Sequence, residues 1–303
     1  MLTITRLYTL GSIRKDLINR LKDCSSTPVL DADCILKHVL KLTKEEIFLK
    51  PDIPVSKKNY RKICKNLSKR KTGLPIAYIT GQKEFYGYDF YVNTSVLIPK
   101  PDTEILVEKA LEKTGTVFPS NKTLRVLDLC TGSGAVGIAF YLEALKNGIS
   151  CEMFFSDISS KALKVCHKNI EFHSERDPSL KKRTKILKGN LLTPVLKTFG
   201  KESFDLILTN PPYVPEKTSR ELLKDGRAEP LLALNGGADG LALIRKIIPD
   251  ARKLLVPGGL IFLESGETQT EIISRYFLDN GFCSIIRHRD LEGQFRVTEA
   301  RKQ

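Results

Sequence analysis

A strand–turn–helix–strand pattern near the middle of the chain constrains its fold more than any other feature. Residues 124–130 are mostly apolar and predict a buried strand, and Thr131-Gly132-Ser133-Gly134 follows as a tight turn. A helix is predicted for residues 135–147, and the strand predicted for residues 151–156 ends in Asp157. Two strands joined through a helix run parallel, so the pattern predicts an α/β sheet.

The turn also matches the spacing of a nucleotide-binding loop. Gly132, Gly134 and Gly137 let a ligand approach the backbone at a helix N-terminus. An acidic residue in the place of Asp157 can hold the two ribose hydroxyls of a nucleotide-like cofactor. The candidate cofactors are therefore a nicotinamide dinucleotide and S-adenosylmethionine. Asp128, inside the end of the first strand, favours S-adenosylmethionine, a methyl donor.

A second motif comes after another apolar run, Phe204–Thr209, which ends abruptly in Asn210-Pro211-Pro212-Tyr213. Prolines fix φ and lack a backbone donor, so this turn is stiff. The Asn210 amide oxygen and the Pro211 carbonyl can together accept both hydrogens of a planar –NH2 group, and the Tyr213 ring can stack on a flat substrate. The turn favours a substrate that reacts at an amide or amine nitrogen, although Asn210 would also suit a structural cap.

These motifs resemble those of class I S-adenosylmethionine-dependent methyltransferases that act on nitrogen, and the likeness covers nearly the whole chain. The residues that carry it are Asp128-Leu-Cys-Thr-Gly-Ser-Gly134, Asp157 and Asn210-Pro-Pro-Tyr213. Within that class, the chain is similar to the peptide chain release factor glutamine methyltransferases in five further segments: Asp31–Leu40, Pro75–Gly81, Glu84–Gly87, Leu97–Glu104 and Arg227–Pro230. The sister family that methylates a glutamine of a ribosomal protein shares the catalytic turn and usually departs at residues 97–104.

The resemblance implies an enzyme that methylates N5 of the glutamine in the Gly-Gly-Gln motif of class I release factors, with S-adenosylmethionine as donor. It implies catalytic roles for Asn210, Pro211 and Tyr213, which together with Pro212 would also bind the substrate. The cofactor-binding residues that it implies are Asp128, Cys130, Thr131, Gly132, Ser133, Gly134, Asp157, Asn190, Leu191, Asn210 and Phe85. The alternatives are a ribosomal protein glutamine methyltransferase, a DNA adenine-N6 or RNA guanine methyltransferase, and an idle cofactor-binding partner protein.

Three positions depart from the pattern of that family. Lys100 stands where the family usually has Arg, which keeps the charge and loses the planar fork that makes bidentate contacts. Cys130 stands where a glycine is usual, and a non-glycine residue tolerates a positive φ poorly. Asn190 replaces a usual Asp after the strand predicted for residues 184–188, so it can accept a hydrogen bond from the adenine amine without adding charge.

Predicted strands and helices alternate from Thr103 onwards, which favours a mostly parallel sheet with helices on both faces. The elements predicted after the Asn210 turn are helices around residues 240–255 and 268–280, a strand at 259–263, and two last strands near 283–288 and 295–300. The short connection between the last two strands suits an antiparallel pair. With the resemblance, this gives an α/β fold of the class I methyltransferase (Rossmann-like) kind: a seven-stranded mostly parallel sheet, a small N-terminal helical domain and a β-hairpin linker.

The charge balance changes near residue 80. Residues 1–80 carry 17 Lys and Arg against 7 Asp and Glu, whereas residues 81–303 carry 32 against 28. A helix predicted from Ser56 to Gly73 has one apolar and one basic face, which suits docking to an acidic partner and equally suits a solvated surface. We expect a helical substrate-docking domain at 1–80, a β-hairpin linker at 81–102 and a methyltransferase domain at 103–303.

Composition points to a soluble globular protein. The chain has 303 residues, 41% of them hydrophobic and 28% charged, and no stretch approaches the roughly 20 apolar residues of a membrane span. The start at residues 1–7 shows no secretory signal, so we expect a cytoplasmic protein with neither a membrane nor a direct nucleic-acid partner. The 7 cysteines lack a Cys-x-x-Cys pair and the 4 histidines lack ligand spacing, so no metal site is expected.

Overall fold

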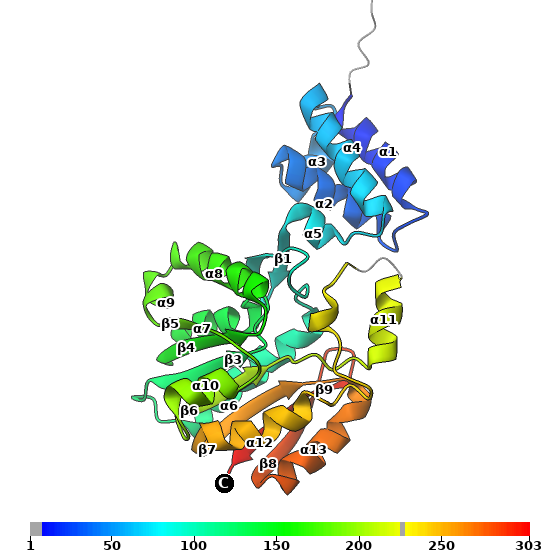
Figure 1. The fold of residues 1–303 in the computed structure, drawn as a ribbon. Helices are drawn as coiled ribbons and strands as arrows, with labels where there is room; N and C mark the ends of the chain where they lie inside the picture. Colours follow the sequence, from blue (N-terminus) through cyan, green and yellow to red (C-terminus); the bar gives the residue numbers. More distant parts are fainter. Residues whose placement is uncertain (1–7, 225–227) are drawn as a thin grey trace, which may run out of the picture. The chain divides into compact units, whose positions relative to one another are not determined.

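Figure 1 shows the computed structural model of the protein, which describes residues 8–224 and 228–303. The chain folds into two compact units, one made of residues 1–82 with 222–228 and one of residues 83–221 with 229–303. Arg227, part of a segment that resembles the family, lies outside the described residues, as do residues 1–7. No helix in the described ranges is long and apolar enough to cross a membrane.

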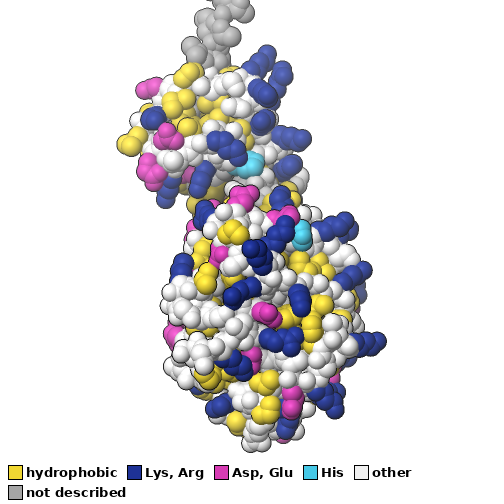
Figure 2. Space-filling view, turned by 90° about the vertical axis from the view of Figure 1, so that its left-hand side faces the viewer, with side chains coloured by type: hydrophobic (Ala, Val, Ile, Leu, Met, Phe, Trp, Pro, Cys, Tyr) yellow, Lys and Arg dark blue, Asp and Glu magenta, His cyan; other side chains and the backbone are white. Residues whose placement is uncertain are grey.

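The first unit contains a bundle of short helices. These are α1 (Leu10–Leu21), α2 (Pro28–Leu40), α3 (Lys44–Leu49), α4 (Lys57–Lys71) and α5 (Ile76–Thr80). The helix predicted from Ser56 is confirmed, since the Ser56 hydroxyl accepts a hydrogen bond from the Asn59 amide at 3.2 Å and caps α4. Ile63 of α4 is buried in the core of the bundle, while Lys62 and its basic neighbours on α4 are exposed. Figure 2 shows many Lys and Arg side chains on the surface of this unit.

The second unit is built on a seven-stranded sheet with the strand order β5-β4-β3-β6-β7-β9-β8. Its strands are β3 (Leu124–Leu129), β4 (Cys151–Asp157), β5 (Thr184–Lys188), β6 (Phe204–Thr209), β7 (Leu255–Glu264), β8 (Phe282–Arg289) and β9 (Phe295–Lys302). Strands β3 to β7 pair in parallel, and β9 pairs antiparallel with both β7 and β8. The predicted α/β class, the mostly parallel seven-stranded sheet and the final antiparallel pair are therefore confirmed.

Helices cover both faces of this sheet (Figure 1). The helices and 3-10 turns that follow α5 along the chain are η1 (Pro101–Thr103), α6 (Glu104–Val117), α7 (Ala135–Lys146), α8 (Ser160–Ser174), α9 (Pro178–Lys182), α10 (Thr193–Phe199), α11 (Glu216–Lys224), η2 (Leu231–Ala233), α12 (Ile244–Leu254), η3 (Glu267–Gln269) and α13 (Thr270–Asp279). Side chains alternate along β6, so Leu206 and Leu208 join the core shared with α6, α7 and α8, whereas Ile207 joins the core shared with α10, α12 and α13. Burial on both faces explains why this strand is mostly apolar.

A two-stranded hairpin, β1 (Gln82–Phe85) and β2 (Tyr88–Tyr91), precedes the sheet along the chain. Asn169 of α8 fastens it to the glycine turn. The Asn169 amide oxygen accepts from the Tyr91 amide at 2.7 Å, and its Nδ2 donates to the carbonyls of Tyr91 and Ser133 at 3.0 and 2.8 Å. One buried side chain therefore holds the hairpin against the turn that precedes α7.

Some element ends differ from the sequence-based boundaries where glycine and proline crowd together. The helix predicted around residues 240–255 begins only at Ile244, and Gly240 before it takes a φ of 79°, which a right-handed helix cannot contain. The strand predicted at 259–263 begins earlier, at Leu255, and its pairing with β6 shifts register before Leu260. An irregular segment holding Pro and Gly accounts for that shift.

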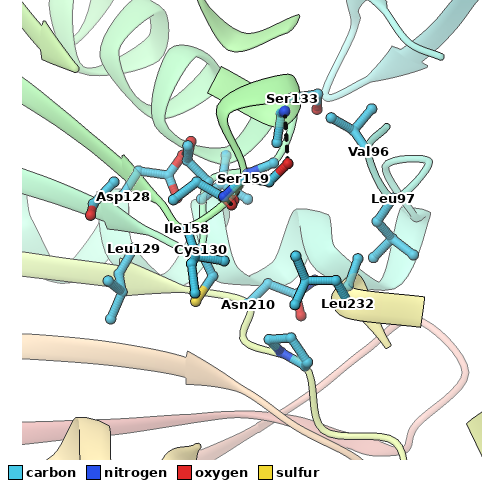
Figure 3. Close-up of a pocket in the computed structure, with 18 of the residues that line it drawn as sticks. Val96, Leu97, Asp128, Leu129, Cys130, Ser133, Ile158, Ser159, Asn210 and Leu232 are labelled. Atoms are coloured by element: carbon cyan, nitrogen blue, oxygen red, sulfur yellow. Dashed lines mark hydrogen bonds between the residues drawn. The ribbon is translucent and has the colours of Figure 1, made fainter. Parts of the chain in front are cut away.

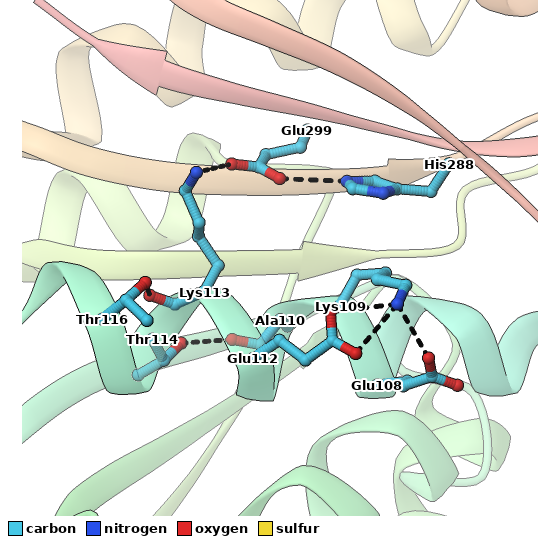
Figure 4. Close-up of polar contacts among 9 residues, drawn as sticks. All are labelled: Glu108, Lys109, Ala110, Glu112, Lys113, Thr114, Thr116, His288 and Glu299. Carbon is cyan, nitrogen blue, oxygen red and sulfur yellow. Dashed lines mark hydrogen bonds and ion pairs between the residues drawn. The ribbon is translucent and has the colours of Figure 1, made fainter.

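Two polar clusters lie along α6, one exposed and one buried (Figure 4). Lys109 contacts Glu108 and Glu112 at 2.8 Å each. One turn further, Lys113 lies 3.3 Å from one oxygen of Glu299 on β9, and His288 on β8 lies 2.9 Å from the other. Glu299 is only 2% exposed. Because exposed pairs stabilise little and a buried carboxylate needs its partners, the Glu299 cluster is the one that fixes α6 against the antiparallel edge of the sheet.

Candidate active site

A cavity of about 190 Å³ opens at the carboxyl ends of β3, β4 and β6 (Figure 3), the edge at which sheets of this kind bind ligands. Among the residues expected at the site, those that line it are Phe85, Asp128, Cys130, Thr131, Gly132, Ser133, Asp157, Asn190, Leu191, Asn210 and Pro212. Gly134, Pro211 and Tyr213 are not among its described lining residues. Within the described ranges, no group of three or more His, Cys, Asp or Glu is placed to hold a metal ion.

Asp128, the last residue but one of β3, ties the glycine turn to α7. Its Oδ2 accepts from the Thr131 hydroxyl at 2.6 Å and from the Gly137 amide at 3.0 Å. A Cβ at position 137 would lie 2.9 Å from this carboxylate and 2.5 Å from Phe155, so only glycine fits there. Burial raises the pKa of Asp128 to about 7, although its two hydrogen bonds oppose that rise. The third glycine of the nucleotide-binding spacing therefore serves helix–strand packing.

The glycine turn uses left-handed backbone at alternate residues, with φ of 59° at Cys130, 55° at Gly132 and 82° at Gly134. A Cβ on Gly134 would lie 2.8 Å from the Cys166 Sγ, whereas a Cβ on Gly132 would have no atom within 4 Å. Open space therefore lies beside Gly132. Cys130, one of the departures found in the sequence, adopts the positive φ that the usual glycine would take freely, at a cost of roughly 1–2 kcal/mol.

Asp157 ends β4 and is bound by two backbone amides. Its Oδ2 accepts from the Gly132 amide at 3.0 Å, and its Oδ1 accepts from the Ser159 amide at 2.8 Å. Burial raises the pKa of Asp157, and the amide hydrogen bonds lower it. Each carboxylate oxygen keeps a further lone pair, so Asp157 can still accept hydrogen bonds from the hydroxyl groups of a ligand.

Asn190 and Leu191, which follow β5, also line the cavity. Ile158, directly after Asp157, also lines the cavity and is 46% exposed. Ile158 is not among the residues expected from the sequence. The sequence does contain one indication of its role. Ile158 is an apolar residue directly after the acidic residue that ends a strand, a position from which it can cover one face of a flat ring.

Asn210 lies at the end of β6, and a residue far along the chain orients its side chain. The Asn210 Nδ2 donates to the Thr103 Oγ1 at 3.2 Å, across a separation of 107 residues. The amide oxygen of Asn210 therefore remains as an acceptor. Thr103 itself lines the cavity, and the sequence analysis missed it because nothing local marks a contact at that distance along the chain.

Tyr213 packs against the core on the α12–α13 side of the sheet, and its hydroxyl donates to the Glu264 Oε1 at 3.1 Å. Stacking of its ring on a substrate therefore stays a prediction. Glu264, at the end of β7, is 2% exposed, and its Oε2 has no partner in hydrogen-bond geometry. Burial raises the pKa of Glu264 to about 7, while Thr103, Tyr213 and Arg296 lower it.

Lys100, another of the three positions that depart from the family pattern, forms an ion pair at the cavity. Its Nζ lies 2.7 Å from the Oε1 of Glu229, a buried carboxylate that also accepts from the Ile98 amide at 3.4 Å. Lys100 and Pro230 both line the cavity. Lysine makes one contact here as a point charge, whereas an arginine could make two.

Comparison with known proteins identifies the family. Residues 12–81 match the family model described as the PrmC N-terminal domain, and residues 108–237 match the one described as conserved hypothetical protein 95. The release factor glutamine methyltransferase of Coxiella burnetii is 35% identical over 98% of this chain and 100% of its own length. That of Clostridium acetobutylicum is 37% identical over 89% of this chain and 90% of its own. The chain belongs to the release factor glutamine methyltransferase family.

Membership of this family confirms the resemblance inferred from the sequence, and it makes the chain a methyltransferase. Among solved structures, the N-terminal domain of human METTL16 in complex with SAH matches 94% of this chain and 96% of its own, with a TM-score of 0.53 and 17% identity. At that identity the likeness concerns the fold alone, and it agrees with the predicted Rossmann-like class. The roles of the individual cavity residues stay predictions.

Proposed function

We propose that this protein methylates N5 of the glutamine in the Gly-Gly-Gln motif of class I peptide chain release factors, with S-adenosylmethionine as the methyl donor. The observation that carries the proposal is that all but one of the residues selected for the donor, together with Asn210 and Pro212 of the turn, line one cavity at one edge of the sheet. The relatives that cover 98% and 89% of the chain, whose names state release factor glutamine methylation, support this substrate.

The cavity suits the donor because its residues offer complementary contacts. Asp157 would accept hydrogen bonds from the ribose hydroxyls, and the Asn190 amide oxygen would accept one from the adenine amine. Open space beside Gly132 lets a ligand approach the backbone, and Ile158 would cover one face of the adenine. When bound, the donor supplies an electrophilic methyl group on a sulfonium sulfur.

The Asn210 turn would orient the acceptor nitrogen. A glutamine amide nitrogen is a poor nucleophile because its lone pair is delocalised into the carbonyl. The Asn210 Oδ1 and the Pro211 carbonyl would accept its two N–H groups, hold the nitrogen in line for displacement and stabilise the positive charge that develops on it. No strong base is needed before transfer, because the methylated nitrogen is acidic and its proton then leaves to water.

The other parts of the chain take supporting roles in this proposal. Residues 1–80 form a domain that docks the protein substrate, residues 81–102 form a linker and residues 103–303 form the methyltransferase domain. The exposed basic residues of α4 suit docking to an acidic surface. The enzyme acts in the cytoplasm, with neither a membrane nor a nucleic acid as a direct partner.

The test incubates the purified protein with labelled S-adenosylmethionine and, separately, a class I release factor, ribosomal protein and duplex DNA. We expect label on the release factor, and its loss when the glutamine of Gly-Gly-Gln is changed. Asn210→Ala should lower kcat at least about 100-fold, whereas Asn121→Ala, at an exposed turn, should retain the rate. Label on the ribosomal protein alone would indicate the sister activity, and label on DNA alone would make the enzyme a base methyltransferase.

A further inference from the structure

The Asn-Pro-Pro-Tyr turn depends on its neighbours to hold its backbone in place. Pro211 and Pro212 carry no N–H group, so this stretch offers only carbonyl oxygens to its surroundings. The proposed reaction needs the Pro211 carbonyl and the Asn210 amide oxygen at defined positions. The groups that pack against the next two carbonyls, those of Pro212 and Tyr213, therefore help to determine where the acceptors for the substrate amide lie.

A glycine-rich loop, residues 235–241, lies directly beside the chain that leaves this turn. The Val214 amide donates to the Leu234 carbonyl, and the Gly236 amide donates to the Val214 carbonyl, both at 2.9 Å. The two segments thus form a short parallel bridge immediately after the turn. The loop is therefore attached to the turn through backbone hydrogen bonds on both of its neighbouring peptide groups.

Two glycines bring the backbone of the loop close to the turn. A Cβ at Gly236 would lie 2.7 Å from the Pro212 carbonyl oxygen, and a Cβ at Gly240 would collide with the Tyr213 carbonyl oxygen. Both glycines are buried, and Gly240 also has a φ of 79°. Real Cβ atoms essentially never come within 3.0 Å of another heavy atom, so a side chain at either position requires the neighbouring backbone to move.

Gln269 joins the loop to the turn through its side-chain amide. Its Nε2 donates to the Tyr213 carbonyl at 3.0 Å and to the Asp239 carbonyl at 3.3 Å. Its Oε1 accepts from the Gly266 amide at 2.9 Å. Gln269 is only 8% exposed, and both N–H groups of its amide have an acceptor. One buried side chain thus holds a carbonyl of the turn and a carbonyl of the loop together.

We propose that Gly236, Gly240 and Gln269 are positioning residues for the methyl-transfer reaction. They fix the second half of the Asn-Pro-Pro-Tyr turn, and the stiff proline pair transmits that position to the two acceptor oxygens at its start. None of the three is among the described lining residues of the cavity, so they act through the turn and touch neither donor nor substrate. The inference rests on the proposed function for its kinetic readout, and amide exchange gives a second readout that needs no substrate.

The first experiment compares Gly240→Ala with Gly237→Ala. Both glycines belong to the loop and have a positive φ, 79° and 92°, but the three atoms nearest to a Cβ at Gly237 all belong to Ala242. Both variants should lose stability, whereas only Gly240→Ala should lower kcat on the release factor, by roughly 10- to 100-fold. Gly237→Ala should stay within about threefold of the natural kcat, and both variants should keep the natural donor affinity within about twofold.

Gln269→Glu tests the same contact without adding backbone strain, and it carries the test if Gly240→Ala does not fold. The new carboxylate keeps an oxygen for the Gly266 amide and replaces the Nε2 donor with a second oxygen, which the Tyr213 and Asp239 carbonyls repel. We expect kcat to fall by a similar factor. The KM for the release factor should change less than about threefold, because Gln269 is buried and the variant alters no exposed surface.

Hydrogen exchange of the Val214 amide gives the second readout, because this amide bonds to the Leu234 carbonyl next to the loop. It should exchange at least about 10-fold faster in Gly240→Ala and Gln269→Glu than in the natural protein, and at nearly the natural rate in Gly237→Ala.

A natural kcat in folded Gly240→Ala or in Gln269→Glu would overturn the proposal. Equal losses of kcat in Gly240→Ala and Gly237→Ala would also overturn it, because the loop would then only support the fold. If the natural protein left the release factor unlabelled, the proposed function would be wrong. Faster exchange of Val214 in Gly240→Ala alone of the two glycine variants would still support the loop as the element that fixes the turn, and equal exchange would overturn that role.

Discussion

The two sides of the cavity are held in different ways. On the donor side, Asp128 is bound by residues 3 and 9 positions away along the chain, and Asp157 by a residue 2 positions away and one 25 positions away. On the acceptor side, Asn210 is bound by Thr103 across 107 residues. The donor side is therefore local architecture that a short sequence motif can specify, whereas the acceptor side exists only once the sheet has assembled.

Each side nevertheless rests on one buried carboxylate at a strand end. Asp128 on the donor side and Glu264 on the acceptor side both have a pKa raised to about 7 by burial. Asp128 accepts hydrogen bonds from the Thr131 hydroxyl and the Gly137 amide, while Glu264 accepts one from the Tyr213 hydroxyl. In both places a buried carboxylate holds a turn that follows a strand.

The largest expected effect is the pH dependence of stability. The folded-state pKa of Asp128, about 7, lies above the unfolded value of about 3.9, so between these values the folded state binds the extra proton and stability falls as pH rises. Asp128→Asn removes that loss. The stability of the variant relative to the natural protein, from urea unfolding, should rise by about 3 kcal/mol between pH 4 and pH 7.

Glu264→Gln should show the same sign over the same window, because its carboxylate also has a raised folded-state pKa. If the stability of both variants relative to the natural protein did not change with pH, the two carboxyl groups would have the same pKa in the folded and the unfolded state. If the relative stability rose with pH for only one variant, only one side of the cavity would contain a carboxyl group whose pKa is raised by folding.

The next effect separates the two sides by donor affinity. Asp157→Ala removes the acceptor for the Gly132 and Ser159 amides together with the proposed ribose contact, and should weaken donor binding about 100-fold in calorimetry. Thr103→Val serves as the matched acceptor-side variant and should bind the donor almost unchanged. If both variants lost donor affinity equally, the cavity would act as one unit, with no difference between its donor and acceptor sides.

The sequence predicts the features that depend on local contacts better than those that depend on contacts between distant segments. The strands at residues 184–188 and 204–209 and the glycine turn were predicted from local pattern, and the structure has both strands at those residues. Thr103 and Ile158 line the cavity and were missed. Periodicity and turn chemistry report on neighbours along the chain, so a contact across 107 residues leaves no mark that a single sequence can show.

Glu264 shows the limit most clearly. It ends the apolar strand β7 and is only 2% exposed. What it does there depends on Tyr213, which comes from a different segment of the fold. A sequence can therefore indicate that a polar residue is buried without indicating which groups it binds.

A smaller effect concerns the packing of the donor-side turn. Gly134→Ala would place a Cβ 2.8 Å from the Cys166 Sγ at a φ of 82°, and should destabilise the fold by about 2 kcal/mol. Gly132→Ala has the same kind of backbone with no atom within 4 Å, so it should cost only about 1 kcal/mol, as measured by thermal unfolding. Adding Cys166→Ala should recover part of the loss in Gly134→Ala and none in Gly132→Ala, unless the strain lies in the backbone alone.

The smallest effect tests whether the departure at Cys130 is a local matter. Cys130→Gly and Cys130→Ala both remove the thiol, and only glycine relieves the left-handed backbone at a φ of 59°. The glycine variant should be more stable than the alanine variant by about 1 kcal/mol in thermal unfolding, because the alanine keeps the unfavourable φ. Donor affinity should be alike in the two variants, since both remove the thiol and leave the rest of the cavity unchanged. An alanine variant as stable as the glycine variant would contradict this expectation. It would show that packing of the assembled sheet, and not the residue at position 130, determines the backbone conformation there. The donor side would then depend on contacts between distant segments, as Asn210 does on the acceptor side.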